Sequence, residues 1–101
     1  MKKVLLGLSL ALFLTPSVSM ASDGASLFVH KCGNCHKRGG AAAVVNPADK
    51  AGVVWEKYFN RGRHPENLAA TINDGELQTV IQYLKSHAAD SDQPAAAVIP
   101  K

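Results

Sequence analysis

One short segment, Cys32-Gly33-Asn34-Cys35-His36, contains both cysteines of the 101-residue chain and one of its four histidines. Residues of these types at this spacing could form a redox disulfide, supply half of a metal site, or attach a haem covalently. Redox pairs of this kind usually accompany a strand–helix–strand unit, and a structural zinc site needs four ligands. The sequence has no alternating strand pattern and no second cysteine pair, so haem attachment explains the segment best.

Haem attachment assigns a role to each reactive residue of this segment. The thiols add to the two vinyl groups of haem and form thioether bonds, and the residues between them match their separation to the macrocycle. The adjoining histidine then lies below the iron. We therefore predict one covalently bound haem c, with Cys32 and Cys35 as the attachment points and His36 as the proximal iron ligand.

The N-terminal residues 1–21 have the features of a secretory signal peptide. Lys2 and Lys3 precede an apolar run, Val4–Leu14, and the segment ends in Ser19-Met20-Ala21, with small residues where a signal peptidase reads. A membrane anchor is the alternative, but it needs about 20 apolar residues, more than this run contains. We expect cleavage after Ala21, no membrane span in the remaining chain, and a location in the periplasm or outside the cell.

Apolar residues at helical spacing, with suitable cap residues beside them, predict one all-α domain at residues 22–89. The expected helices cover about Ser22–Asn34, Asn46–Gly62 and Asn73–Ala88. Asn46-Pro47 is suited to begin a helix, Gly62 to end one, and Asn73 with Glu76 resembles a capping box. Residues 90–101 are polar and contain proline, so we expect a flexible C-terminal tail, frayed or lying over the surface.

Gly24, Phe28 and Cys32 follow one another at four-residue spacing, and Tyr83-Leu84 lies in the last expected helix. Together with the Cys-x-x-Cys-His segment, these residues form a pattern that resembles the small monohaem class I cytochromes c over about residues 24–88. The resemblance implies a small cytochrome c-type fold, with three main helices wrapped around one covalently attached haem. It also implies that the first and last helices cross closely where Gly24 has no side chain.

The same resemblance suggests further residues of the haem pocket. In the family, a proline carbonyl accepts the second N–H of the proximal histidine, and Pro47 follows His36 at a similar spacing. Such a contact would fix the orientation of the imidazole ring. Trp55 and Phe59 belong to the apolar face of the second helix and are expected to line the pocket as well.

The sequence departs from the family at the sixth iron ligand, which is usually a methionine before the last helix. Met1 and Met20 are the only methionines, and both belong to the expected signal peptide. His64 lies in the loop before the last helix, and Pro65 disfavours helical backbone there, so we predict His64 as the distal ligand. His30 fits a surface position, and His87 fits a capping role at a helix end. An open distal site is the alternative.

Two imidazole ligands favour a low reduction potential, because methionine ligation raises it. A six-coordinate iron has no free position for oxygen or peroxide, so we expect an electron carrier rather than an enzyme. The sequence thus predicts a periplasmic or exported monohaem c-type cytochrome that passes single electrons between redox proteins. The alternative is a haem-based sensor or gas-binding protein whose distal site is open or whose distal ligand is displaceable.

The charge distribution bears on the partners. The formal net charge of +3 falls to about +1 once Lys2 and Lys3 are removed, so a nucleic-acid partner is not expected. Basic residues nevertheless gather between Lys31 and Arg63, where Asp49 and Glu56 are the only acidic residues. This segment predicts either an ordinary solvated surface or a basic rim around the haem edge that faces another redox protein.

Overall fold

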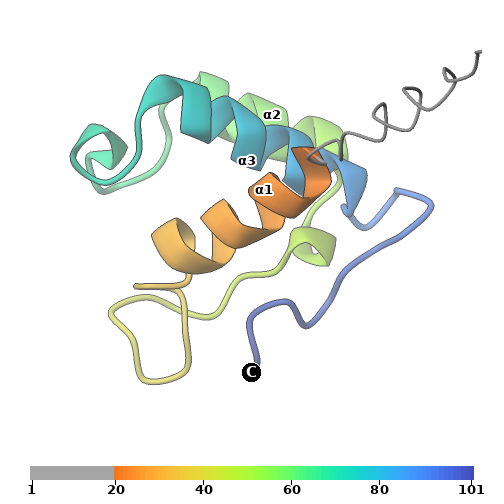
Figure 1. The fold of residues 1–101 in the computed structure, drawn as a ribbon, viewed down its shortest axis with the longest axis horizontal. Coiled ribbons are helices and arrows are strands. Elements are labelled where there is room, and N and C mark those ends of the chain that lie inside the picture. Colours follow the sequence, from red (N-terminus) through yellow and green to blue (C-terminus); the bar gives the residue numbers. More distant parts are fainter. Residues whose placement is uncertain (1–19) are drawn as a thin grey trace, which may run out of the picture.

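The computed structural model describes residues 20–101, and the predicted signal peptide lies outside these residues apart from its last two positions. The described chain forms three α-helices, α1 (Met20–Leu27), α2 (Gly52–Asn60) and α3 (Asp74–Ser86) (Figure 1). Three short helical turns accompany them: η2 (Phe28–Cys32), η3 (Pro47–Asp49) and η4 (Leu68–Ala70). No strand occurs in this part of the chain, which confirms the all-α prediction.

Helices α1 and α3 cross closely because a glycine faces an aromatic residue at the crossing. A Cβ atom at Gly24 would lie 2.6 Å from the Cβ of Tyr83 and 3.3 Å from the carbonyl oxygen of Thr79. One turn further along, the rings of Phe28 and Tyr83 meet with centroids 5.9 Å apart. The close approach predicted at Gly24 is therefore confirmed, and only a residue without a side chain fits there.

The second helix begins later than the sequence predicts. Pro47 opens the separate 3₁₀ turn η3, and Lys50 and Ala51 are then extended before α2 begins at Gly52. Two contacts from the other end of the chain hold this break: the carboxylate of Asp90 accepts from the Gly52 N–H, and the Ala89 N–H donates to the Lys50 carbonyl. The prediction of one continuous helix was wrong because local cap signals do not report such distant contacts. Its predicted end at Gly62, which has φ 61°, agrees with the structure.

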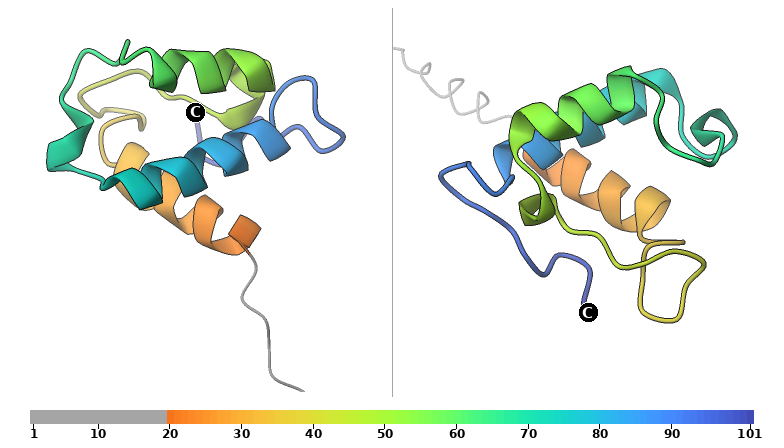
Figure 2. Two further views of the ribbon diagram at one scale, coloured as in Figure 1. Left: turned by 90° about the horizontal axis from the view of Figure 1, so that it is seen from above. Right: turned by 180° about the vertical axis from the view of Figure 1, so that it is seen from behind.

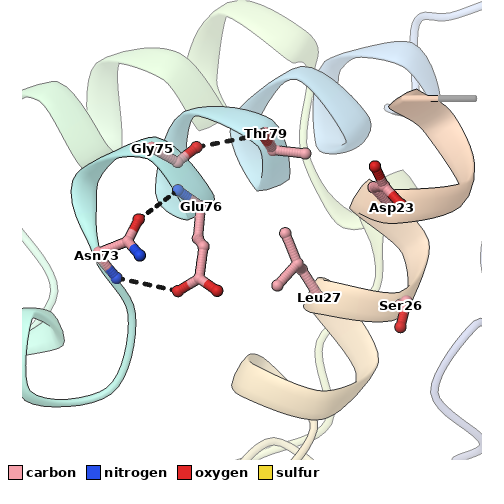
Figure 3. Close-up of a pocket in the computed structure, with 7 residues that line it drawn as sticks. All are labelled: Asp23, Ser26, Leu27, Asn73, Gly75, Glu76 and Thr79. Atoms are coloured by element: carbon pink, nitrogen blue, oxygen red, sulfur yellow. Dashed lines mark hydrogen bonds between the residues drawn. The ribbon is translucent and has the colours of Figure 1, made fainter. Parts of the chain in front are cut away.

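Helix α3 begins with the predicted capping box (Figure 3). The side-chain oxygen of Asn73 accepts from the Glu76 N–H at 2.8 Å, and the Glu76 carboxylate accepts from the Asn73 N–H at 3.2 Å. An open cleft of about 450 Å³ separates this helix start from Asp23, Ser26 and Leu27 of α1. None of the residues predicted to bind haem lines this cleft.

The core lies between the three helices and includes one residue from the C-terminal end. Its buried hydrophobic side chains are Phe28, Trp55, Ile72, Val80, Tyr83, Leu84, Ala88 and Ile99. Residues 90–101 leave α3 in a wide turn and run back beside η3 and the segment that precedes it (Figures 1 and 2). Ile99, which lies within the predicted flexible tail, is buried in this core at 3% exposure.

Candidate functional site

The Cys-x-x-Cys-His segment follows directly from the first helix. The last turn of that helix widens into the π-helical turn η2, which the Gly33 N–H closes by donating to the Phe28 carbonyl at 3.0 Å. The Cys35 and His36 N–H groups then both donate to the Cys32 carbonyl. This turn leaves the Cys32 thiol half-buried and the Cys35 thiol exposed. Both thiols and the imidazole are thus presented by one compact turn at the end of a helix.

The environment of Cys32 does not suit a redox disulfide. Burial of the thiol, with a smaller contribution from neighbouring Cys35, raises the pKa of Cys32 from 9.0 to about 11. Redox-active cysteines have a lowered pKa and often occupy helix N-termini, where the helix dipole stabilises the thiolate. Cys32 instead lies at a helix C-terminus, where the dipole disfavours a negative charge. The thiol is therefore protonated at neutral pH, which counts against redox exchange and is compatible with addition of S–H to a vinyl group.

His36 is oriented by a main-chain carbonyl. Its Nδ1 lies 2.6 Å from the carbonyl oxygen of Ala43, so the neutral ring donates its Nδ1–H there and keeps a lone pair on Nε2. The prediction that the Pro47 carbonyl accepts from His36 was wrong. That carbonyl accepts instead from the indole N–H of buried Trp55 at 2.8 Å.

The path of the connecting loop explains this difference. Gly39 adopts φ 77°, a left-handed conformation that favours glycine, and the Ala42 N–H donates to the Cys35 carbonyl at 3.0 Å. The chain therefore folds back toward His36 at Ala43, four residues before the predicted acceptor, Pro47. Ala43 reaches His36 first, and Pro47 remains free to bind Trp55.

His64 lies close to His36, as the prediction of a second ligand requires. The two ring centroids are 6.1 Å apart and the ring planes meet at 72°. Nδ1 of His64 lies 3.1 Å from the carbonyl oxygen of Glu66, and when it is unprotonated it accepts from the Glu66 N–H at 3.2 Å instead. When this Nδ1 carries the proton it donates to that carbonyl, and Nε2 is then the available ligand atom. Both half-buried imidazoles can therefore present Nε2 while a main-chain oxygen holds the other nitrogen.

The spacing of the two rings fits a single metal ion between them. Metal–nitrogen bonds of about 2.0–2.1 Å, on opposite sides of one ion, place the centroids of two imidazoles about 6.2–6.4 Å apart. The observed separation of 6.1 Å falls within about 0.3 Å of that range. The separation of the His36 and His64 rings is therefore compatible with one metal ion between them.

A row of aromatic side chains on α2 reaches this pair through Tyr58. Trp55 and Phe59 stack with centroids 6.3 Å apart and an interplanar angle of 16°, Trp55 buried and Phe59 half-buried. Tyr58 meets both Phe59 and His64 edge-on, at centroid distances of 5.2 and 6.4 Å. Tyr58 was not among the site residues predicted from the sequence. The signal available was its place beside Phe59 on a helix that ends just before the His64 loop.

The other two histidines do not join this pair. His30 is exposed and lines a surface groove with Val98 and Ile99. His87 follows the last residue of α3, where Nδ1 lies 2.8 Å from the Gln93 carbonyl and the ring packs on Tyr83 with centroids 4.9 Å apart. A capping role for His87 agrees with this position.

A structural zinc site receives no support from the described residues. Across residues 20–101 no three or more His, Cys, Asp or Glu side chains gather closely enough to bind a metal ion. Within the same residues, none of the helices has the length and apolar character needed to cross a membrane.

No protein-family model matches the chain, and no curated protein or solved structure shows significant similarity to it. The function must therefore be argued from the site itself.

Proposed function

We propose that this protein is a monohaem c-type cytochrome that carries single electrons between other redox proteins. The observation that carries the proposal is the 6.1 Å spacing of His36 and His64, because His36 belongs to the Cys-x-x-Cys-His segment. His64 would therefore offer a second imidazole to an iron bound by His36. The arrangement supports covalent attachment through Cys32 and Cys35, with His36 and His64 as axial ligands.

Each residue of the site has a distinct task in this proposal. Cys32 and Cys35 hold haem c by thioether bonds, each formed when S–H adds across one vinyl group, sulfur to one carbon and hydrogen to the other. His36, held by the Ala43 carbonyl, and His64, held by the Glu66 carbonyl, keep their ligand nitrogens in place in both oxidation states. The bound haem supplies an iron centre that gains or loses one electron.

The side chains around the ligands shape the properties of the centre. Trp55 and Phe59 offer apolar surface, and the indole N–H of Trp55 is already satisfied by Pro47, so no polar group is left unpaired there. Two nitrogen ligands favour a lower potential than methionine ligation. Because little rearrangement is needed at either ligand, fast electron exchange is expected.

The proposed location is the periplasm or the exterior of the cell, following removal of residues 1–21. Lys37, Arg38, Lys57, Arg61 and Arg63 have exposed side chains in the segments that carry or adjoin the two histidines. An exposed basic rim of this kind would attract an acidic surface on a redox partner. The rate of electron exchange with such a partner should fall as the salt concentration rises.

A haem-based sensor is the second candidate, and one feature of His64 favours it. The residue lies in a largely exposed loop, and its hydrogen bonds are to Glu66, only two residues away. A loop held mainly by local contacts can open at little cost, which would expose the distal side to a gas.

The experiment that tests the proposal is purification of the full chain from a host that attaches haem c. An intact mass increased by one haem and low-spin absorption spectra in both oxidation states would support the electron carrier. A ferrous spectrum that is high-spin and rapid carbon monoxide binding would favour the sensor. A mature chain without covalent haem would overturn both.

A further inference from the structure

The C-terminal end of the chain is fastened to a fully buried asparagine. Asn46 has 0% exposure, and its side-chain amide pairs with both main-chain groups of Ile99. The Asn46 oxygen accepts from the Ile99 N–H at 2.8 Å, and the Asn46 nitrogen donates to the Ile99 carbonyl at 3.1 Å. The Asn46 amide thus satisfies both the N–H and the carbonyl of Ile99. Loss of the amide would leave these two buried main-chain groups unpaired.

Asn46 ends the segment 33–46, and the side chain of Ile99 lies near Gly33, the residue that begins it. This side chain is 3% exposed, and its Cδ1 would lie 3.3 Å from a Cβ atom at Gly33, the residue that follows Cys32. Ile99 therefore contacts both Gly33 and Asn46. These two residues bracket the segment that contains His36 and its hydrogen-bond acceptor, Ala43.

Further bonds tie the rest of the tail to the body. The Ala48 N–H donates to the Ala95 carbonyl at 2.9 Å, and the Ala95 N–H donates to the His87 carbonyl at 3.0 Å. Nearer to α3, the Asp90 carboxylate accepts from the Gly52 N–H at 2.9 Å. Residues 90–101, hereafter the strap, are thus fixed at several points along their length as they pass η3 (Figure 2).

We propose that the strap positions the proximal ligand: by clamping Gly33 and Asn46 together, it keeps the Ala43 carbonyl on Nδ1 of His36. This inference rests on the proposed function, since it assigns His36 to the iron. A hydrogen bond from Nδ1–H to a carbonyl raises the basicity of a ligating imidazole and fixes its orientation. A more basic imidazole stabilises ferric iron more than ferrous iron. The strap therefore lowers the reduction potential, and loosening it raises the potential.

The test uses the full chain, matured with haem, in wild type and in two strap variants, Asn46→Ala and Ile99→Ala. Spectroelectrochemistry measures the reduction potential, and proton NMR measures exchange of the His36 Nδ1–H with solvent. We expect both variants to have a higher potential than wild type and an exchange rate at least about tenfold faster. Ile99→Val, which retains most of the side chain, should stay close to wild type in both measurements.

Two controls separate positioning from general stability. The double variant Pro100→Ala/Lys101→Ala changes exposed residues beyond Ile99 and should leave potential and exchange unchanged. Gly24→Ala weakens the crossing of α1 and α3 without touching the strap, so it should lower the melting temperature but not shift the potential. If either alanine variant of the strap does not mature, Asn46→Ser replaces it as a smaller change that still removes the amide, and it should shift both measurements in the same direction.

The outcomes distinguish the two proposals. A wild-type chain without covalent haem, or without low-spin iron, overturns the proposed function and the strap inference with it. A wild type with low-spin haem, combined with strap variants that lose thermal stability but keep the wild-type potential and Nδ1–H exchange, overturns the strap inference alone. In that case residues 90–101 stabilise the fold without positioning His36.

Discussion

The rings of His36 and His64 lie 6.1 Å apart, centroid to centroid, and each ring has its Nδ1 beside a main-chain carbonyl. The two residues belong to loops on either side of α2, which packs through Trp55 into the core. The most direct test of the proposed bis-imidazole iron is to replace one residue of this pair.

Replacing His64 should free one coordination position on the iron. The His64→Ala variant is expected to become high-spin when reduced, to bind carbon monoxide readily and to shift in potential, whereas wild type stays low-spin. Absorption spectra of both oxidation states, with and without carbon monoxide, provide the measurement. The matched controls are His30→Ala and His87→Ala, which should keep the wild-type spectrum. A low-spin His64→Ala beside a high-spin His87→Ala would show that the wrong histidine was chosen.

The haem should contribute much of the apolar surface that this small domain buries on folding. Nine hydrophobic side chains are buried among the described residues, a modest core for a chain of this size. The double variant Cys32→Ser/Cys35→Ser, which cannot form thioethers, is expected to be largely unfolded by circular dichroism. The haem-loaded wild type should be helical under the same conditions. A cooperative thermal transition in the variant without haem would argue against this dependence.

Gly24→Ala should destabilise the protein because the added methyl group meets Tyr83. With the new Cβ only 2.6 Å from the Cβ of Tyr83, α1 and α3 must separate, at a cost of about 1–3 kcal/mol in unfolding free energy. Gly75→Ala is the matched control. Its Cβ would meet only the Asn73 side-chain oxygen at 3.5 Å, so we expect a gain of about 0.4–1 kcal/mol. Urea unfolding of the two haem-loaded variants measures the difference, and equal stabilities would refute the close crossing.

Features that depend on neighbouring residues could be predicted from the sequence. The capping box of Asn73 and Glu76 needs only the chemistry of one helix turn, and the structure contains both of its hydrogen bonds. The close approach at Gly24 was implied by the resemblance to the class I cytochromes c, and the structure contains it. The choice of His64 as the distal ligand, made because the remaining chain has no methionine and because Pro65 restricts the backbone there, stays a prediction.

Features that depend on the path of a loop or on distant contacts could not be predicted. The acceptor for His36 is Ala43 rather than Pro47 because Gly39 turns the loop back early, and a glycine in the sequence does not reveal its φ angle. The late start of α2 depends on Asp90, far along the chain. Asn46 does cap a helical turn, η3, where its N–H donates to the Asp49 carboxylate, but its side-chain amide also binds Ile99, and no local pattern predicts that second role.

Tyr83 should make the stability of the protein fall at alkaline pH. Burial raises the pKa of Tyr83 above its ordinary value of 10.0, because the phenolate is poorly solvated between α1 and α3. Below pH 10.0 the phenol is protonated in the folded and unfolded chains, so its favourable burial is fully present. As the pH rises from there to the folded pKa, the unfolded chain loses this proton first. The folded state then binds more protons than the unfolded state, and the unfolding free energy decreases.

Urea unfolding of the haem-loaded protein between pH 8 and pH 11 measures this slope. Tyr83→Phe removes the titrating oxygen while keeping the ring against Phe28, so its unfolding free energy should fall less steeply than that of wild type above pH 10.0. Tyr58→Phe, at the only other tyrosine, is the matched control and should retain the part of the alkaline slope that Tyr83 causes. Parallel curves for wild type and Tyr83→Phe would mean that the phenol ionises as easily in the folded chain as in the unfolded one. The burial of Tyr83, from which the slope follows, would then be less than the structure describes.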